Sequence, residues 1–295
     1  MARTMEKAKI AIRLAVFSVL VAFNTVLLAA QPEFLAATNE TFAHPHDLEF
    51  SPNGKWIFVA DVNHHDIKLL DADTLEQVAI IGKGQLDSPH DVHFDSAGRL
   101  LVADSGNNRI AIFELDGTKA RLVDELTDNL RSPEGVTSDV KGHVYVASTG
   151  NHRVLKFRGK RIIKQVGERG GGKLEFVRPH DIEMGSDGWL YVSDPGNKRI
   201  QILADDLSYR GVIEDNRKPF DEPKYLALDD NNWLYIADQH NNALRVFDAR
   251  HQEVLQIKNA GAKPLNYIEG VEVAADRIWI SDTYNNRIVL FRWSP

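Results

Sequence analysis

Three short motifs in this 295-residue chain combine residue types that can bind a metal or move a proton. Each motif has Pro-His-Asp followed by an aliphatic residue, and the histidines are His46, His90 and His180. Histidine is the commonest metal ligand in proteins and can carry a proton near neutral pH, while aspartate offers oxygen ligands. Two interpretations are open from these residues: the motif is a folding signal, or it marks a metal site.

The motif recurs because the chain contains six similar units, spaced 44 to 46 residues apart. The units begin at His46, His90, Glu134, His180, Lys224 and Glu269. In each unit a short alternating run leads to a turn such as "SPNG" or "GSDG", and a run rich in β-branched and aromatic residues follows. Four short strands in roughly 45 residues is the size of a propeller blade. The sequence therefore predicts an all-β, six-bladed β-propeller over residues 31–295.

The two ends of this region predict how the ring closes. The sixth unit supplies only three strands before Pro295, while the segment after Gln31 has the form of a fourth strand. We expect the strand at about residues 33–38 to complete the last blade. Closure of this kind leaves no unpaired sheet edge between the first and last blades.

A second recurring pattern, "AD..GNNRI..F", stands as "VADSGNNRIAIF" at 102–113 and "ISDTYNNRIVLF" at 280–291. This pattern resembles the NHL repeat, and the resemblance covers nearly all of residues 31–295. It implies a six-bladed propeller with one central channel. The aspartate and arginine, for example Asp104 and Arg109, recur five residues apart, so we interpret them as a structural pair. Residues 59–70 are a degenerate copy, and Ser148 and Ala243 each break one copy.

The first residue of each unit is expected to lie at one mouth of the channel, after a proline that fixes the approach of the chain. Alternate blades would bring together His90, His180 and Glu269, a donor set that suits Zn²⁺ or Fe²⁺. The other alternate set is His46, Glu134 and Lys224, which is a poorer metal cage because lysine is cationic.

The aspartates that follow the histidines are predicted to face the channel. Asp91 and Asp181 offer the hard oxygen ligands that Ca²⁺ prefers. A cation there would relieve the repulsion between clustered carboxylates. The structural alternative is that these aspartates cap backbone groups and that the histidines form hydrogen bonds in a wet channel.

The Pro-His-Asp motif beside the NHL signature is similar to the peptidyl-α-hydroxyglycine amidating lyases, which are secreted six-bladed propellers. The resemblance implies a catalytic zinc held by histidines at blade starts and a structural calcium in the channel. It also implies cleavage of α-hydroxyglycine-extended peptides to a peptide amide and glyoxylate. By motif, His90 and His180 correspond to metal-binding histidines and Asp181 to the calcium-binding aspartate.

The chain departs from that family at several points. Glu269 stands where the family has its third histidine, and His46 could replace it as a ligand. The family's catalytic tyrosine and arginine have no motif that aligns, so Tyr225 is a catalytic candidate only by its proximity to the rim. A carboxylate such as Glu134 or Glu269 is our candidate for moving a proton. The family's disulfides are absent, because the chain has no cysteine.

A non-catalytic binding module is the competing interpretation. Propellers of this repeat type can act as rigid platforms, with a small molecule or peptide at the channel mouth or a protein partner on the rim loops. The variable segments "GERGGGKLEF" and "EDNRKPFDEP" would then carry specificity.

Composition and the N-terminal segment limit the setting. The net charge is −7 with no long basic run, so we expect no nucleic-acid partner, and we also expect no organic cofactor and a monomer. Residues 1–30 have a basic start, an apolar run and a small-residue end, as in a secretory signal peptide. The alternative is an uncleaved membrane anchor, and in either case the propeller would be exported to the periplasm or outside the cell.

Overall fold

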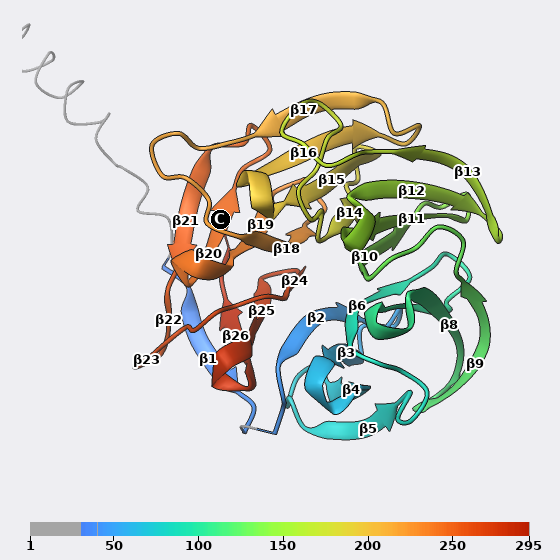
Figure 1. Ribbon diagram of the computed structural model, residues 1–295. Coiled ribbons are helices and arrows are strands. Elements are labelled where there is room, and N and C mark those ends of the chain that lie inside the picture. Colours follow the sequence, from blue (N-terminus) through green and yellow to red (C-terminus); the bar gives the residue numbers. More distant parts are fainter. Residues whose placement is uncertain (1–30, 40, 295) are drawn as a thin grey trace, which may run out of the picture.

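The computed structural model describes residues 31–39 and 41–294, which form a six-bladed β-propeller. Six four-stranded antiparallel sheets follow one another around a central axis in chain order (Figure 1). This architecture confirms the predicted fold, whereas the proposed signal segment 1–30 lies outside the described residues. Within the described ranges, no helix is long and apolar enough to cross a membrane.

Each blade has four strands, which follow one another from the innermost to the outermost. Blade 1 has β2 (Pro45–Phe50), β3 (Trp56–Asp61), β4 (Asp66–Asp71) and β5 (Gln77–Ile81); blade 2 has β6 (Pro89–Phe94), β7 (Leu100–Asp104), β8 (Arg109–Asp116) and β9 (Lys119–Leu126). Blade 3 has β10 (Pro133–Ser138), β11 (His143–Ser148), β12 (Arg153–Arg158) and β13 (Arg161–Val166); blade 4 has β14 (Ile182–Met184), β15 (Trp189–Asp194), β16 (Arg199–Ala204) and β17 (Tyr209–Ile213). Blade 5 has β18 (Pro223–Leu228), β19 (Leu234–Asp238), β20 (Ala243–Phe247) and β21 (Glu253–Ile257); blade 6 has β24 (Val271–Ala274), β25 (Arg277–Asp282), β26 (Arg287–Arg292) and β1 (Glu33–Ala37).

Short 3₁₀ helices join the second and third strands of every blade. They are η1 (Val62–His64), η2 (Ser105–Asn107), η3 (Thr149–Asn151), η4 (Pro195–Asn197), η5 (Gln239–Asn241) and η6 (Thr283–Asn285). A small two-stranded sheet, β22 (Asn259–Ala260) with β23 (Lys263–Pro264), lies between the fifth and sixth blades in the chain.

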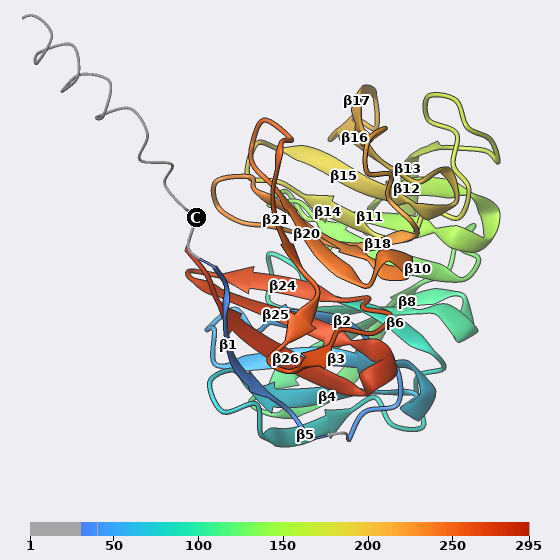
Figure 2. The ribbon, with the colours of Figure 1, turned by 90° about the vertical axis from the view of Figure 1, so that its left-hand side faces the viewer.

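The ring closes as the sequence predicts. Strand β1 pairs antiparallel with β26, so the N-terminal strand is the outer strand of the last blade (Figure 2). The sequence-distant ends of the propeller are therefore held together by a sheet ladder.

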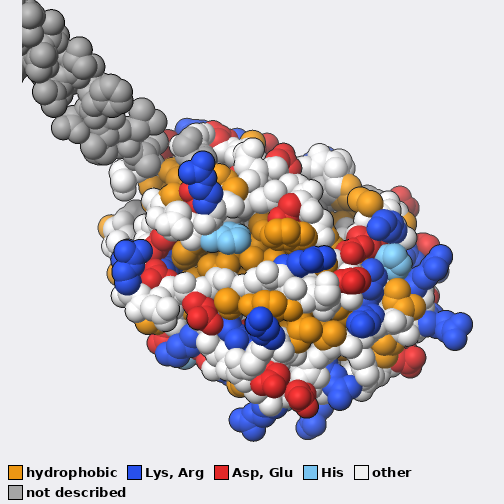
Figure 3. Space-filling model, turned by 90° about the horizontal axis from the view of Figure 1, so that it is seen from above, with side chains coloured by type: hydrophobic (Ala, Val, Ile, Leu, Met, Phe, Trp, Pro, Cys, Tyr) orange, Lys and Arg blue, Asp and Glu red, His pale blue; other side chains and the backbone are white. Residues whose placement is uncertain are grey.

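Charged side chains of both signs lie among hydrophobic ones on the face of the molecule that Figure 3 shows.

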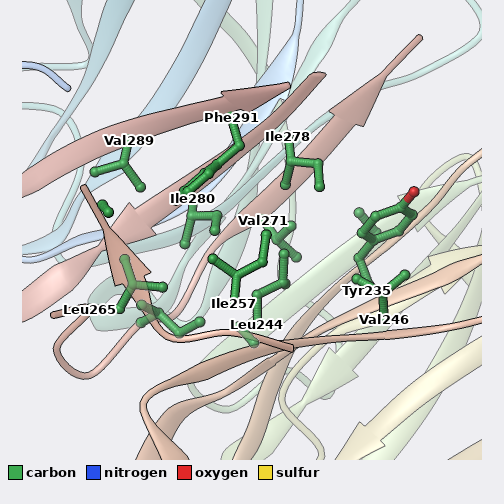
Figure 4. Close-up of a cluster of buried hydrophobic side chains, with 14 of the residues drawn as sticks. Tyr235, Leu244, Val246, Ile257, Leu265, Val271, Ile278, Ile280, Val289 and Phe291 are labelled. Atoms are coloured by element: carbon green, nitrogen blue, oxygen red, sulfur yellow. The ribbon is translucent and has the colours of Figure 1, made fainter. Parts of the chain in front are cut away.

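The hydrophobic core is divided into clusters that lie between neighbouring blades. The cluster in Figure 4 brings Leu244 and Ile257 of blade 5 against Val271, Ile280 and Phe291 of blade 6. All five side chains are buried. Apolar residues on the faces of each sheet therefore fix the angle between adjacent blades, and the polar residues of the innermost strands are left to the channel.

The Asp-Arg signature forms the same hydrogen-bond network in several blades, and its predicted structural role is confirmed by these bonds. Asp104 accepts hydrogen bonds from Asn107 Nδ2 at 2.9 Å and Arg109 Nε at 2.7 Å. Its other oxygen accepts the backbone N–H of Asp87 at 2.7 Å, in the segment that leads to the innermost strand of its own blade. Equivalent bonds surround Asp194 and Asp282. The signature thus fixes where each innermost strand starts.

Blade 5 keeps this network although Ala243 replaces the signature arginine. Arg245, two residues further along β20, places Nη1 3.2 Å from Asp238 Oδ2. Its Nη2 lies 3.2 Å from Asp215 Oδ2 and 3.1 Å from Glu253 Oε2. Arg245 is 1% exposed, so one buried guanidinium is shared by three carboxylates.

Blade 1, the degenerate copy, keeps the network in the same way. Asp66 stands in place of the arginine, and Lys68, two residues later, pairs with Asp61. Lys68 also donates to the backbone oxygen of Thr41 at 2.7 Å. A cation two positions after the expected one therefore preserves the network in both blades that lack the arginine.

Candidate functional site

The six unit-start residues lie at one mouth of the channel, and in four blades an irregularity of the innermost strand sets them apart. In blade 2 the register shifts between Pro89 and Asp91, so His90 is an extra residue without a cross-strand partner. Register shifts occur at the same place in β2, β10 and β18. A bulge of this type re-aims a side chain, and here it explains why these positions differ from the rest of the strand.

His180 and Glu134 form the tightest polar pair of the mouth. His180 Nε2 lies 2.9 Å from Glu134 Oε2, and the imidazole is 2% exposed. Burial, together with Lys224, lowers the pKa of His180 to about 4. Burial would raise the pKa of Glu134, but His180, His90 and Lys224 lower it to about 2. At neutral pH a neutral imidazole therefore places Nε2 beside an ionised carboxylate, and His180 Nδ1 is buried without a hydrogen-bond partner.

His90 is oriented by the backbone. Its Nδ1 lies 2.8 Å from the carbonyl oxygen of Ser88, which requires a proton on Nδ1 and leaves Nε2 with a free lone pair. Its ring centroid is 4.7 Å from that of His46 and 6.4 Å from that of His180. The three motif histidines are therefore neighbours at the mouth.

His46, the predicted alternative to Glu269 as third ligand, lies beside that residue. His46 Nδ1 and Glu269 Oε2 are 3.1 Å apart, but their geometry is not that of a hydrogen bond and both atoms lack a hydrogen-bond partner. Burial lowers the pKa of His46 well below its usual value and raises the pKa of Glu269 to about 7. The other Glu269 oxygen accepts a hydrogen bond from Gln239, a residue that the sequence analysis did not single out.

Tyr225 crosses the channel beneath the histidines. Its hydroxyl donates to the backbone oxygen of His90 at 2.9 Å, and a second backbone oxygen, that of Glu134, lies 3.4 Å away. Its ring centroid lies 4.8 Å from that of His180. The ring comes from blade 5 and contacts residues of blades 2, 3 and 4, so Tyr225 forms the floor of the mouth.

The aspartates of the Pro-His-Asp motifs use oxygens to hold neighbouring blades together. Asp91 Oδ2 accepts the backbone N–H of Val136 at 2.5 Å, and Asp181 Oδ2 accepts that of Leu226 at 2.7 Å. Each bond crosses from one innermost strand to the next, because the inner edge of that strand has no neighbouring strand. The capping role considered as the structural alternative is thus present for both residues.

Carboxyl groups are concentrated in the channel, at the positions that follow the motif histidines. Burial raises the pKa of Asp91 to about 7 and the pKa of Asp181 well above its usual value. Burial, together with the nearby Asp91 and Asp181, also raises the pKa of Asp47 well above its usual value. Among the described residues, no three His, Asp or Glu side chains are already arranged around a common point as metal ligands.

The far end of the channel contains a cavity of about 130 Å³ that is lined by Glu49, His93, Glu183 and Glu272, among others. Burial and the nearby Glu49 raise the pKa of Glu272 well above its usual value. A carboxyl group with a raised folded-state pKa binds more protons in the folded state than in the unfolded state, so stability is lost as the pH rises.

We expect the Glu272→Gln substitution to reduce this pH dependence. The free energy of unfolding of the wild type should fall as the pH rises from about 4.5 towards the raised pKa, and the variant should be more stable than the wild type at pH 8 by roughly 1–3 kcal/mol. Urea unfolding at pH 4.5 and 8, in the presence of a chelator, measures both proteins. Glu76→Gln, at an exposed position, is the control and should leave the pH profile unchanged. An equal pH profile for Glu272→Gln and the wild type would contradict the prediction.

Comparisons with known proteins agree on the repeat and the fold. The NHL repeat model matches residues 86–113 and 130–157. No curated protein matches the chain. Among solved structures, a gluconolactonase from Xanthomonas campestris is 14% identical over 90% of this chain and 96% of its own, with a TM-score of 0.68.

Two further solved structures have the same fold and other roles. A catalytically inactive virginiamycin B lyase from Staphylococcus aureus with quinupristin is 14% identical over 90% of this chain and 99% of its own, with a TM-score of 0.63. An auxiliary nutrient binding protein from Bacteroides thetaiotaomicron is 15% identical over 86% of this chain and 70% of its own, with a TM-score of 0.69. Such low identities establish the propeller fold and leave the function to the site itself.

Proposed function

We propose that this six-bladed propeller of NHL repeats is an exported, metal-dependent lyase that acts on peptides ending in α-hydroxyglycine. His46, His90 and His180 would hold a divalent metal ion, Zn²⁺ or Fe²⁺, at the channel mouth. Export is part of the proposal and depends on the signal-like segment 1–30.

The arrangement of the histidine nitrogens is the observation that supports a metal. In metal sites, a ligating histidine directs its other ring nitrogen to a carboxylate or a backbone carbonyl. His180 has this arrangement with Glu134, and His90 has it with the backbone of Ser88. The buried Nδ1 of His180 is left without a partner, which is a cost that a bound metal would remove. The donor types are those that zinc prefers, with Glu269 as an alternative ligand to His46, although the described side chains would have to move to surround one ion.

A bound zinc ion would supply Lewis-acid polarisation of a substrate oxygen. Lys224 would attract the terminal carboxylate of the substrate. It is the lysine among the six unit-start residues, and its charge lowers the pKa values of His46, His180 and Glu134. Glu269 has a pKa of about 7, which suits a group that takes the substrate hydroxyl proton and returns it to the departing amide nitrogen. The C–N bond would break as the hydroxyl carbon becomes the aldehyde of glyoxylate.

Glu134 and Tyr225 would support this reaction from the walls of the site. Glu134 would keep His180 in the Nε2–H tautomer and add negative charge beside the metal. Tyr225 would hold the backbone of His90 through its hydroxyl. We therefore place Glu134 and Tyr225 in positioning roles, and we assign proton transfer to Glu269, one of the two carboxylates predicted for it.

Glyoxylate release tests the proposed activity. The purified protein, loaded with Zn²⁺, should release glyoxylate and a peptide amide from a peptide that ends in α-hydroxyglycine, and a chelator should stop the release. Glu269→Gln should lower kcat by about 10²–10⁴-fold, the usual contribution of a group that transfers a proton. A protein that holds zinc in the mouth and releases no glyoxylate would contradict the lyase proposal.

A binding platform is the second candidate, and one surface feature favours it. Part of the variable segment "EDNRKPFDEP", from Glu214 to Lys218, lines a surface hollow of about 440 Å³ together with Phe247 and His251. A peptide or protein partner bound there would need no metal.

Calcium in the channel, near Asp91 and Asp181, is also a proposal, and added Ca²⁺ should then raise the melting temperature of the protein at neutral pH.

A further inference from the structure

A serine, a histidine and a glutamate from three blades form a connected row at the far end of the channel. Ser138 Oγ lies 3.0 Å from His93 Nε2, and His93 Nδ1 lies 3.2 Å from Glu49 Oε2. His93 and Glu49 are each three residues beyond a mouth residue on their strands, which is about 10 Å along the channel. This row is therefore separate from the histidine mouth.

The backbone fixes the protonation pattern of the row. The N–H of Ser138 donates to His93 Nε2 at 3.1 Å, so Nε2 carries a lone pair and the ring proton is on Nδ1. That proton faces Glu49, whose Oε2 is held by the backbone N–H of Phe94 at 3.1 Å. The tautomer is the one that a general base needs: the Nε2 lone pair is shared by the N–H and the hydroxyl of Ser138, and Nδ1 faces a carboxylate.

The serine is accessible from a second hollow. Ser138 is half-buried and lines a hollow of about 320 Å³ together with Val140, Met184 and Gly185. Val140 is 91% exposed at this surface. A largely apolar hollow beside a serine hydroxyl suits a small acyl group.

We propose that Ser138, His93 and Glu49 form a nucleophilic triad for acyl transfer from esters with a small apolar acyl group. Ser138 Oγ attacks the ester carbonyl carbon while its proton passes to His93 Nε2, and that proton then goes to the departing alkoxide. Water attacks the acyl-serine next, gives a proton to His93, and releases the acid as the proton returns to Ser138. Glu49 orients His93 and stabilises the imidazolium.

Architecture alone accounts for only part of this geometry. Asp91 and Asp181 also accept a backbone N–H from the next blade, that of Val136 and that of Leu226 respectively. Such a bond requires only that the channel side chain be an acceptor. His93 provides this bond to the N–H of Ser138. The contact with the serine hydroxyl and the pairing with Glu49 are additional, and they are what the triad requires.

A serine-directed fluorophosphonate probe and p-nitrophenyl butyrate test the proposal on the full chain. We expect the probe to label Ser138, as mapped by peptide mass spectrometry, and the protein to hydrolyse the ester. His93→Gln keeps an acceptor for the Ser138 N–H and should lower kcat by about 10³-fold, and Glu49→Gln should lower kcat with KM unchanged. Ser138→Ala should abolish labelling and turnover.

Ser186→Ala is the matched control, because Ser186 lines the same hollow without a histidine beside its hydroxyl. It should leave labelling and hydrolysis unchanged, and circular dichroism confirms that each variant is folded. Labelling at another serine, no labelling of the wild type, or equal hydrolysis by Ser138→Ala would each overturn the triad. Neither assay depends on the metal at the mouth, so the result is independent of the proposed lyase.

Discussion

Replacing Arg245 with alanine should lower the free energy of unfolding by about 3–5 kcal/mol, the usual cost of removing one partner from a buried ion pair. The guanidinium is 1% exposed and lies near Asp215, Asp238 and Glu253. Its charge centre also stacks on Phe220 at 4.5 Å. The substitution leaves the fully buried Asp238 without a cation and opens a cavity beside the aromatic ring of Phe220. Guanidinium unfolding, followed by circular dichroism, measures the loss.

Two further variants decide whether the effect comes from this network. Arg121→Ala removes an exposed ion pair with Glu114 and should change the free energy of unfolding by less than about 1 kcal/mol. Ala243→Arg combined with Arg245→Val returns the cation to the signature position and should recover a large part of the loss. A loss below about 1 kcal/mol in the free energy of unfolding for Arg245→Ala, or no recovery in the double variant, would contradict the idea that Arg245 replaces the signature arginine.

The fold could be predicted from the sequence because each blade repeats the same local instructions. The offset of five residues between Asp104 and Arg109 marks a hydrogen-bond network that the structure shows in detail. Ring closure followed from a missing strand at one end and a spare strand at the other. That Arg245 takes the place of the missing signature arginine could not be predicted. A cation seven residues after Asp238 is recognisable as its partner only when the strand pairing is known.

The candidate site could be predicted in its position but not in its pairings. In four blades a bulge at the strand start determines how far the mouth side chain turns, and its extent is not encoded in a single residue type. The pair His180 and Glu134 crosses between adjacent blades, whereas residues of alternate blades were predicted to meet. Ser138 was missed because its neighbour His93 is 45 residues away and lies on another blade.

Zinc binding at the mouth should respond in opposite directions to two substitutions that each remove one charge. Glu134→Gln should weaken zinc binding about 10–100-fold, because Glu134 orients His180 and such outer-shell partners contribute that much to affinity. Lys224→Gln should strengthen binding, because the lysine charge opposes a divalent cation beside His46 and His180. Competition with a chelating dye at fixed pH measures both dissociation constants.

Removing the ligands themselves should have the largest effect on metal content. Metal analysis of the purified His90→Ala/His180→Ala double variant should find no stoichiometric zinc, because two of the three imidazole donors are gone. The Lys224→Gln variant excludes general disruption of the mouth as the cause, since disruption would weaken binding in every variant. Equal metal content in the wild type and the double variant, or weaker binding in Lys224→Gln, would show that any zinc is held elsewhere and that the mouth histidines have a structural role.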